Sequence, residues 1–160
     1  MVKITRNFEF LRIYRDSLPN YQQDDFHFKK GKSSSTINNF STKSKLVIPD
    51  ELENFYRFSY GAVLDEYNVF TIGEIKRFKL ELIKTYKDLW QDNILPFAEV
   101  VGVGDCVAFD LSQSSPEGLL IVDGFHEIPP AEWKGICFGL ENWLRQMVGH
   151  NFQPFWLSHK

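Results

Sequence analysis

Residues 95–124, LPFAEVVGVGDCVAFDLSQSSPEGLLIVDG, decide the fold, because they predict three short strands in a meander. Residues 97–101 form the first predicted strand. Gly102 and Gly104 follow it, and glycine readily adopts the φ > 0 conformations of a tight turn. In residues 106–111 the side chains alternate between two sets, V/F/L and C/A/D, which is the period of a strand with two unlike faces. An antiparallel sheet is therefore expected here.

The second half of this stretch predicts the turn and the strand that complete the meander. Residues 115–118, SPEG, have proline and glycine where a type I turn favours them. Residues 119–122, LLIV, are apolar throughout, which suits a central strand covered on both faces. No residue of the stretch pairs a nucleophile with a base, so we expect it to be scaffold.

Length and composition favour one globular domain, residues 1–160. The chain is 43% hydrophobic and 24% charged, which provides enough apolar surface to bury a core. Its formal net charge of −3 argues against direct nucleic-acid binding, because phosphate contacts need clustered lysine and arginine. The same charge is compatible with a basic protein partner.

Cysteine usage and hydropathy argue against several other classes of protein. Cys106 and Cys137 have apolar neighbours, and we expect buried free thiols rather than a disulfide or a metal pair. The sequence has no CxxC motif, no uncharged apolar segment at its N-terminus, and no apolar run of about 18 residues that could span a bilayer. A cytoplasmic protein without a metal, a cofactor or a membrane anchor is expected.

Amphipathic segments on both sides of the meander predict helices. The first helix is expected at residues 5–18, with Thr5 or Asn7 as its cap, and the second at residues 50–59, with Gly61 ending it. A third is expected to begin at Thr71, with an apolar stripe that reaches Trp90, and a fourth at residues 138–148. Thr71 and Glu74 have the spacing of a capping box. Helices gather before and after the strands instead of alternating with them, which predicts an α+β fold with a central antiparallel meander sheet flanked by helices.

The remaining internal segments have weaker patterns. Residues 22–45 read as a polar loop region, in which residues 26–28 could form a short strand. Residues 62–68 are expected to be a turn before a short strand at 69–70. Another short strand is expected at residues 131–135.

The C-terminal tail, residues 149–160, is rich in aromatic side chains. Its large apolar residues are too hydrophobic to remain in water: Phe152, Phe155, Trp156 and Leu157. The tail either packs back on the domain or covers a partner, and we favour packing.

A search for catalytic chemistry finds little. The carboxylates of the meander and the loop after it are Asp105, Asp110, Asp123 and Glu127. They lie at strand ends and turns, where aspartate is common because it hydrogen-bonds to the backbone. Asp110 shares a strand face with Cys106 and Ala108, and if that face is buried its carboxylate needs a partner. The histidines have no ligand spacing and no serine lies in a GxSxG motif, so an enzyme is not expected.

The order of the motifs resembles the SUKH superfamily over about residues 47–148. The resemblance rests on IPDELENFYRFSYGA, NVFTIGEI, PFAEVVGVGDCVAFDL, GLLIVDGFHEI and FGLENWLRQM. Members of that superfamily are α+β proteins without catalytic activity. The resemblance therefore implies a binding module. Two features depart from the family pattern: the polar segment and the aromatic tail.

The resemblance leaves two functions open. Many bacterial members are immunity proteins that neutralise a cognate toxin by binding it, and others are regulatory interaction proteins, including a fungal cell-wall synthesis regulator.

For an immunity protein, an acidic surface would complement a basic toxin such as a nuclease. The contacts we expect are aromatic and acidic side chains near turns: Trp90, Asp92, Asp105, Asp110 and Trp133. Either tryptophan could instead belong to the core. A regulatory module would hold a peptide or a small ligand in a preformed pocket.

Overall fold

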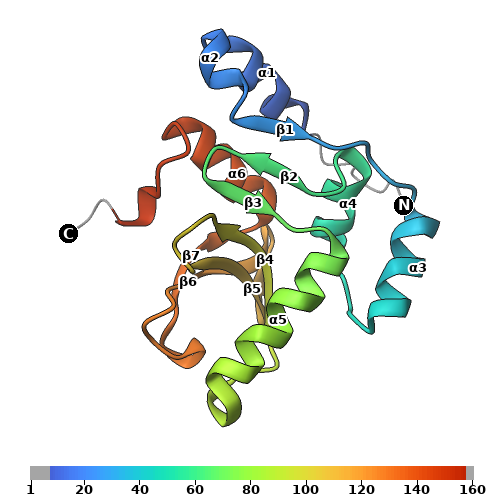
Figure 1. Ribbon diagram of the computed structural model, residues 1–160, viewed down its shortest axis with the longest axis vertical. Coiled ribbons are helices and arrows are strands. Elements are labelled where there is room, and N and C mark those ends of the chain that lie inside the picture. Colours follow the sequence, from blue (N-terminus) through green and yellow to red (C-terminus); the bar gives the residue numbers. More distant parts are fainter. Residues whose placement is uncertain (1–7, 158–160) are drawn as a thin grey trace.

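The computed structural model describes residues 8–157, and in this range the chain forms one seven-stranded antiparallel sheet whose strand order follows the sequence (Figure 1). The strands are β1 (Phe26–Phe28), β2 (Ala62–Leu64), β3 (Tyr67–Val69), β4 (Ile94–Val100), β5 (Cys106–Ser115), β6 (Gly118–Gly124) and β7 (Lys134–Phe138). The α-helices are α1 (Glu9–Ser17), α2 (Asn20–Gln23), α3 (Ser34–Ser44), α4 (Asp50–Phe58), α5 (Ile72–Tyr86) and α6 (Leu140–Gly149). This arrangement confirms the predicted α+β class and its antiparallel meander.

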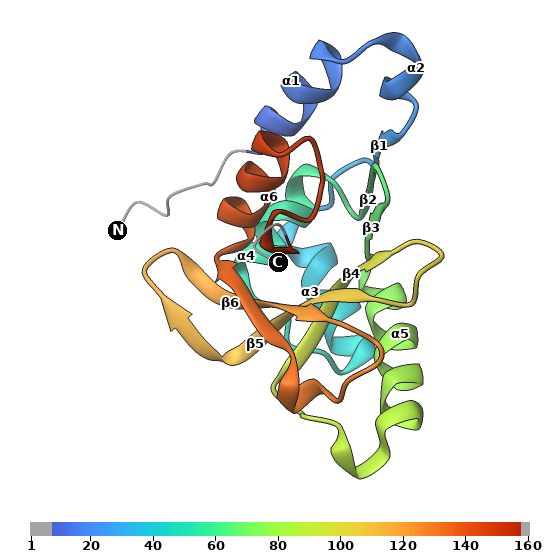
Figure 2. The ribbon, with the colours of Figure 1, turned by 90° about the vertical axis from the view of Figure 1, so that its left-hand side faces the viewer.

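The predicted meander corresponds to strands β4, β5 and β6. Pro96 does not precede β4 but lies inside it, at a register shift between Pro96 and Ala98. A second shift lies between Asp110 and Ser114, where β5 bulges and continues into a polar hairpin. This β5–β6 hairpin protrudes from the sheet (Figure 2), and the Glu51 carboxylate of α4 accepts a hydrogen bond of 2.8 Å from the Leu119 N–H. Irregular pairing bends and twists a sheet, so both shifts change the direction of its strands.

The alternation in β5 separates two cores. Val107 and Phe109 are buried in the larger core with side chains of α4 and α6, whereas Cys106 and Ala108 belong to a smaller core on the opposite face. Side chains of α5 cover that second core. Strands β4–β6 therefore lie between helices on both sides (Figures 1 and 2).

Helix α5 begins as its sequence predicts. The Thr71 side chain accepts a hydrogen bond from the Glu74 backbone N–H, and the Glu74 carboxylate accepts one from the Thr71 N–H. These reciprocal bonds satisfy two backbone donors of the first turn. The helix ends at Tyr86, and Lys87 adopts a φ of 54° before a short 3₁₀ turn. Trp90 thus lies beyond the helix rather than on its stripe.

The short strand expected at residues 26–28 is confirmed as β1, but the expectation of a loop over the rest of residues 22–45 is wrong, because this segment also contains α2 and α3. Ser33 caps α3 by accepting a hydrogen bond of 3.2 Å from the Thr36 N–H. Ile37 is buried and Phe40 packs against the same core, while the rest of the helix surface is polar. So few apolar contacts leave almost no periodic signal in the sequence.

Two other predicted boundaries are also corrected. Residues 62–68 are not one turn but the hairpin β2–β3, in which Asp65 adopts a φ of 58°. Trp133 follows a 3₁₀ turn and precedes β7 instead of lying within a strand. The proposed caps Thr5 and Asn7 lie outside the described residues.

Helix α4 begins at Asp50 as predicted, but Gly61 does not directly end it. The helix ends at Phe58, with Ser59 as its C-cap, and Gly61 (φ 81°) leads into β2.

Candidate functional site

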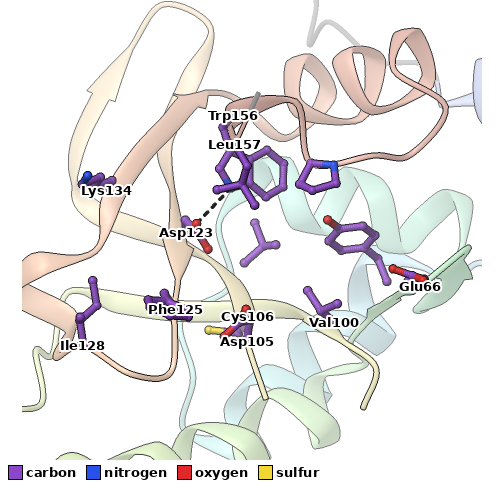
Figure 3. Close-up of a pocket in the computed structure, with 13 residues that line it drawn as sticks. Glu66, Val100, Asp105, Cys106, Asp123, Phe125, Ile128, Lys134, Trp156 and Leu157 are labelled. Atoms are coloured by element: carbon purple, nitrogen blue, oxygen red, sulfur yellow. Dashed lines mark hydrogen bonds between the residues drawn. The ribbon is translucent and has the colours of Figure 1, made fainter. Parts of the chain in front are cut away.

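A cleft of about 480 Å³ opens between the C-terminal tail and the edge of the sheet (Figure 3). The tail forms one wall, and the ends of β3–β7 with the loop after β6 form the others. Its apolar lining consists of Val100, Val107, Phe125, Ile128, Pro154 and Leu157. Its polar and aromatic lining consists of Glu66, Tyr67, Asp105, Cys106, Asp123, Lys134 and Trp156.

The tail forms this wall because its aromatic residues fold back on the domain. Phe152 is buried, with its ring centroid 5.3 Å from that of Phe26 and 5.7 Å from that of Tyr14. Trp156 donates a hydrogen bond from its indole Nε1 to the Asp123 carboxylate over 3.1 Å. The packing we favoured from the sequence is therefore confirmed for this part of the tail.

Three of the described residues that line the cleft are carboxylates, and they are spread along it (Figure 3). Asp105 accepts hydrogen bonds from His126, at 3.0 Å from the backbone N–H and 2.6 Å from Nδ1. Asp123 holds Trp156, and Glu66 is exposed on the β2–β3 turn. Lys134 lies on the side of the cleft opposite Glu66 and is the cross-strand neighbour of Asp123 (Figure 3).

Tyr67 lies in this acidic environment. Only 3% of the residue is exposed, and its ring packs edge-on against Trp143. Burial raises the pKa of its hydroxyl, and the carboxylates of Asp123, Glu66, Asp65 and Asp105 raise it further. The hydroxyl has no hydrogen-bond partner among the residues that the structure describes. The cleft thus contains a neutral, unpaired phenol near several negative charges.

The two cysteines are unsuited to nucleophilic chemistry. Burial, followed by the carboxylates of Asp123 and Asp105, raises the pKa of the Cys106 thiol. Burial also raises the pKa of Cys137, to about 11. Both thiols are free, as predicted, although Cys137 is only half-buried. Since the thiolate is the reactive form, neither group is activated at neutral pH.

The rim of the cleft exposes apolar side chains to solvent. Phe125 is 37% exposed and Leu157 is 45% exposed. Val101 and Val103, on the adjoining β4–β5 turn, are more than half exposed. Large exposed apolar side chains that gather around one cleft are typical of an interaction surface.

Of the sequence-predicted contact residues, Asp105 alone lines the cleft. Asp92 is exposed in the turn before β4, and Trp90 is half-buried against the smaller core. Asp110 pairs with Ile94 at the start of β4, whereas Asp105 lies beside the end of that strand. The structure therefore places Trp90, Asp92 and Asp110 at the end of the sheet away from the cleft.

Two of these candidates have clear structural roles. Trp133 is 8% exposed, and its Nε1 donates hydrogen bonds of 3.0 Å to the carbonyls of Phe125 and Ile128. The buried Asp110 carboxylate accepts hydrogen bonds from Asn93, Ser112 and Gln113. The partner that we expected for a buried Asp110 is therefore present. Neither side chain is exposed as an anchor for another protein.

Sequence reasoning missed Glu66 and Tyr67 as members of a site, because both lay in a predicted turn. Trp156 had a signal, since an apolar tail predicts packing, but nothing in the sequence placed it opposite Asp123. Within residues 8–157, no group of three histidine, cysteine or acidic side chains could hold a metal ion. In the same range no helix is long and apolar enough to cross a bilayer.

Comparison with known proteins is informative at the level of the family. A search of curated proteins finds no match. The model of the SMI1 / KNR4 family (SUKH-1) matches residues 31–146, which include β2–β7 and the helices α3–α5. Members of this family are generally non-catalytic and are associated with protein–protein interaction. The chain belongs to the SMI1 / KNR4 family (SUKH-1).

Proposed function

We propose that this protein is an immunity protein that neutralises a cognate bacterial toxin by binding it directly. Membership of a family whose roles include toxin immunity and cell-wall regulation supports this function. The observation that carries the proposal is the cleft with its apolar rim and its carboxylates, which suits the docking of a basic protein. Steric occlusion of the toxin would be sufficient, so no catalytic group is needed.

The proposed partner is a toxin domain with a basic surface, such as a nuclease. A nuclease must attract phosphate, so its active surface is rich in lysine and arginine. Carboxylates on the immunity protein would compete with the nucleic acid for that surface. Electrostatic attraction would also speed the encounter of the two proteins.

The test is affinity purification from the native cells, followed by a growth assay. The affinity tag belongs at the N-terminus, because the C-terminal tail forms a wall of the cleft. Expression of the recovered partner alone should arrest growth, and co-expression of this protein should restore it. A stoichiometric partner whose expression is harmless would contradict immunity.

A second function is favoured by one specific observation. The cleft is preformed, which is what a regulatory module that holds a peptide or a small ligand requires. Such a module would bind several proteins that share a short segment, and none of them would be toxic. The purification and growth assay described above therefore separate the two functions.

A further inference from the structure

We propose that the cleft is a receptor for one arginine side chain of the partner protein, whose guanidinium group is bound by the carboxylates and by the Tyr67 hydroxyl. This inference rests on the proposed function, because it names the partner chemistry that the binding surface recognises. Three independent features of the cleft support it: its charge, the unpaired hydroxyl of a largely buried tyrosine and its apolar walls.

The charge of the cleft favours a cation. Glu66, Asp105 and Asp123 line it, and the one lysine of the lining, Lys134, lies on the side opposite Glu66 (Figure 3). His126 contacts Asp105 on its outer side and can offset part of its charge when protonated. Even so, carboxylates outnumber cationic groups among the described residues that line the cleft, and Glu66 lies on the side away from Lys134. Partly enclosed charges attract an opposite charge more strongly than exposed ones, because solvent screens them less.

Tyr67 provides the observation that points to a ligand rather than to a merely acidic surface. The residue is 97% buried and lines the cleft, yet its hydroxyl has no hydrogen-bond partner among residues 8–157. Among the described residues, the fully buried side-chain nitrogen and oxygen atoms without a partner belong to Trp90 and Trp143, so the Tyr67 oxygen is open to the cleft and available to a ligand. A ligand N–H group in the cleft would supply the missing hydrogen bond, with the phenol oxygen as the acceptor.

The walls select arginine over a small cation. Phe125 and Trp156 line the cleft with aromatic surface, and Val100 and Val107 provide aliphatic surface. The arginine stem would cover the aliphatic surface, and its flat guanidinium can stack on a ring while donating in several directions. Lysine carries a compact, strongly hydrated ammonium group and gains less from these walls.

The test uses the full-length protein labelled with ¹⁵N and the peptide acetyl-Gly-Arg-Gly-amide. The matched control peptide replaces arginine by citrulline, which has nearly the same shape without the charge. We expect the arginine peptide to shift the signals of the Trp156 indole and of residues 66–67 and 123–125, with a Kd of about 1 mM. The citrulline peptide should shift none of them at the same concentration. Equal shifts with both peptides, or shifts with neither, would overturn the inference.

Variants then assign the contacts. Tyr67→Phe removes only the hydroxyl, and Asp123→Asn removes the charge while its amide oxygen can still accept from Trp156. Each should weaken binding of the arginine peptide by roughly tenfold. Asp92→Asn, which removes the same charge from the far end of β4, should leave the affinity unchanged. An equal loss in Asp123→Asn and Asp92→Asn would show a general charge effect, and that result or an unchanged affinity in Tyr67→Phe would overturn the proposed site.

Failure of this inference can be distinguished from failure of the proposed function. If the peptide does not bind but the protein still rescues growth from its toxin, the arginine receptor is excluded and immunity stands. If the peptide binds as expected but the purified partner is harmless, the receptor stands and immunity is excluded.

Discussion

Asp110 is the single residue on which the protruding hairpin depends most. Its carboxylate accepts hydrogen bonds from Asn93 at 2.7 Å, from Gln113 at 3.0 Å, and from both the backbone and the hydroxyl of Ser112. These donors lie around the bulge of β5 and on the turn before β4. Asp110→Asn introduces an N–H donor where donors already point, so we expect the free energy of unfolding to fall by about 1–3 kcal/mol. Urea denaturation at pH 7 measures it.

The same residue predicts a dependence of stability on pH. Burial acts to raise the pKa of Asp110, but the hydrogen bonds from Ser112, Asn93 and Gln113 outweigh it and hold the pKa below its usual 3.8. A lowered pKa in the folded state stabilises the protein above pH 3.8, and this stability is lost as the pH falls further. The difference between wild type and Asp110→Asn should therefore shrink below pH 3.8. A constant difference would contradict this assignment.

Tyr67 predicts that the stability of the protein changes at alkaline pH. Burial and the surrounding carboxylates raise its pKa above the usual 10.0, so the folded protein keeps the phenol neutral where the unfolded chain ionises it. Its contribution to stability is complete below pH 10.0 and is lost as the pH rises above that value. Tyr67→Phe should lose less stability than wild type in that range, as measured by urea denaturation at a series of pH values. Because the hydroxyl is unpaired, the variant should not be destabilised at pH 7.

At the scale of the element, the capping box of α5 is expected to contribute to the stability of the protein. Thr71→Ala removes the capping hydrogen bond and should lower the free energy of unfolding by about 1 kcal/mol. Thr85→Ala is the matched control, because its hydroxyl only bonds back to the Glu81 carbonyl within the same helix. Thermal denaturation of both variants should show a lower melting temperature for Thr71→Ala alone.

The tail offers a second test at this scale. Phe152 is 3% exposed and contacts Tyr14 and Phe26, whereas Leu157 is 45% exposed. Phe152→Ala should therefore destabilise the protein by about 3–5 kcal/mol, while Leu157→Ala should cost less than about 0.5 kcal/mol. Chemical denaturation measures both. Equal stability of the two variants would mean that the tail does not pack as the structure describes.

Elements whose signals are local could be predicted from the sequence. The capping box of Thr71 and Glu74, the glycines after β4 and the alternation in β5 each act over a few residues, and each has its predicted role. The helix α3 and the hairpin β2–β3 could not be predicted, because long-range packing stabilises them. Ile37 is buried among residues distant in sequence, and the turn at Asp65 has no glycine to mark it.

At the scale of the whole molecule, the fold brings distant segments to one cleft. Its lining comes from the β2–β3 turn, from β4 and β5, from the end of β6 with its following loop, and from the tail. No sequence motif contains these segments together. Asp105 could be proposed because it is an acidic residue at a turn, but nothing in the sequence placed Glu66, Tyr67 and Trp156 beside it. The sequence also offered Trp90 and Trp133 as contacts but left open that either belongs to the core, because composition and spacing do not distinguish an aromatic anchor from aromatic core.

The negative charge of the cleft arises only when the whole chain is folded, because its carboxylates come from different elements. Glu66, Asp105 and Asp123 are each ordinary surface or turn carboxylates in their local surroundings. The tail contacts Asp123 through Trp156 and lines the same cleft as Glu66 and Asp105, so separate charges share one surface beside apolar side chains. A partner would therefore recognise the assembled edge of the sheet and not any single element.

The most direct measurement for the central claim is hydrogen–deuterium exchange of this protein, alone and with the partner recovered from native cells. Binding through the cleft predicts slower exchange at residues 66–67, 100–107, 123–128 and 154–157, with the turn at 90–93 unchanged. Slower exchange confined to residues 90–93 and the β5–β6 hairpin would contradict it. That result would place the binding surface at the opposite end of the sheet, around Trp90 and Asp92.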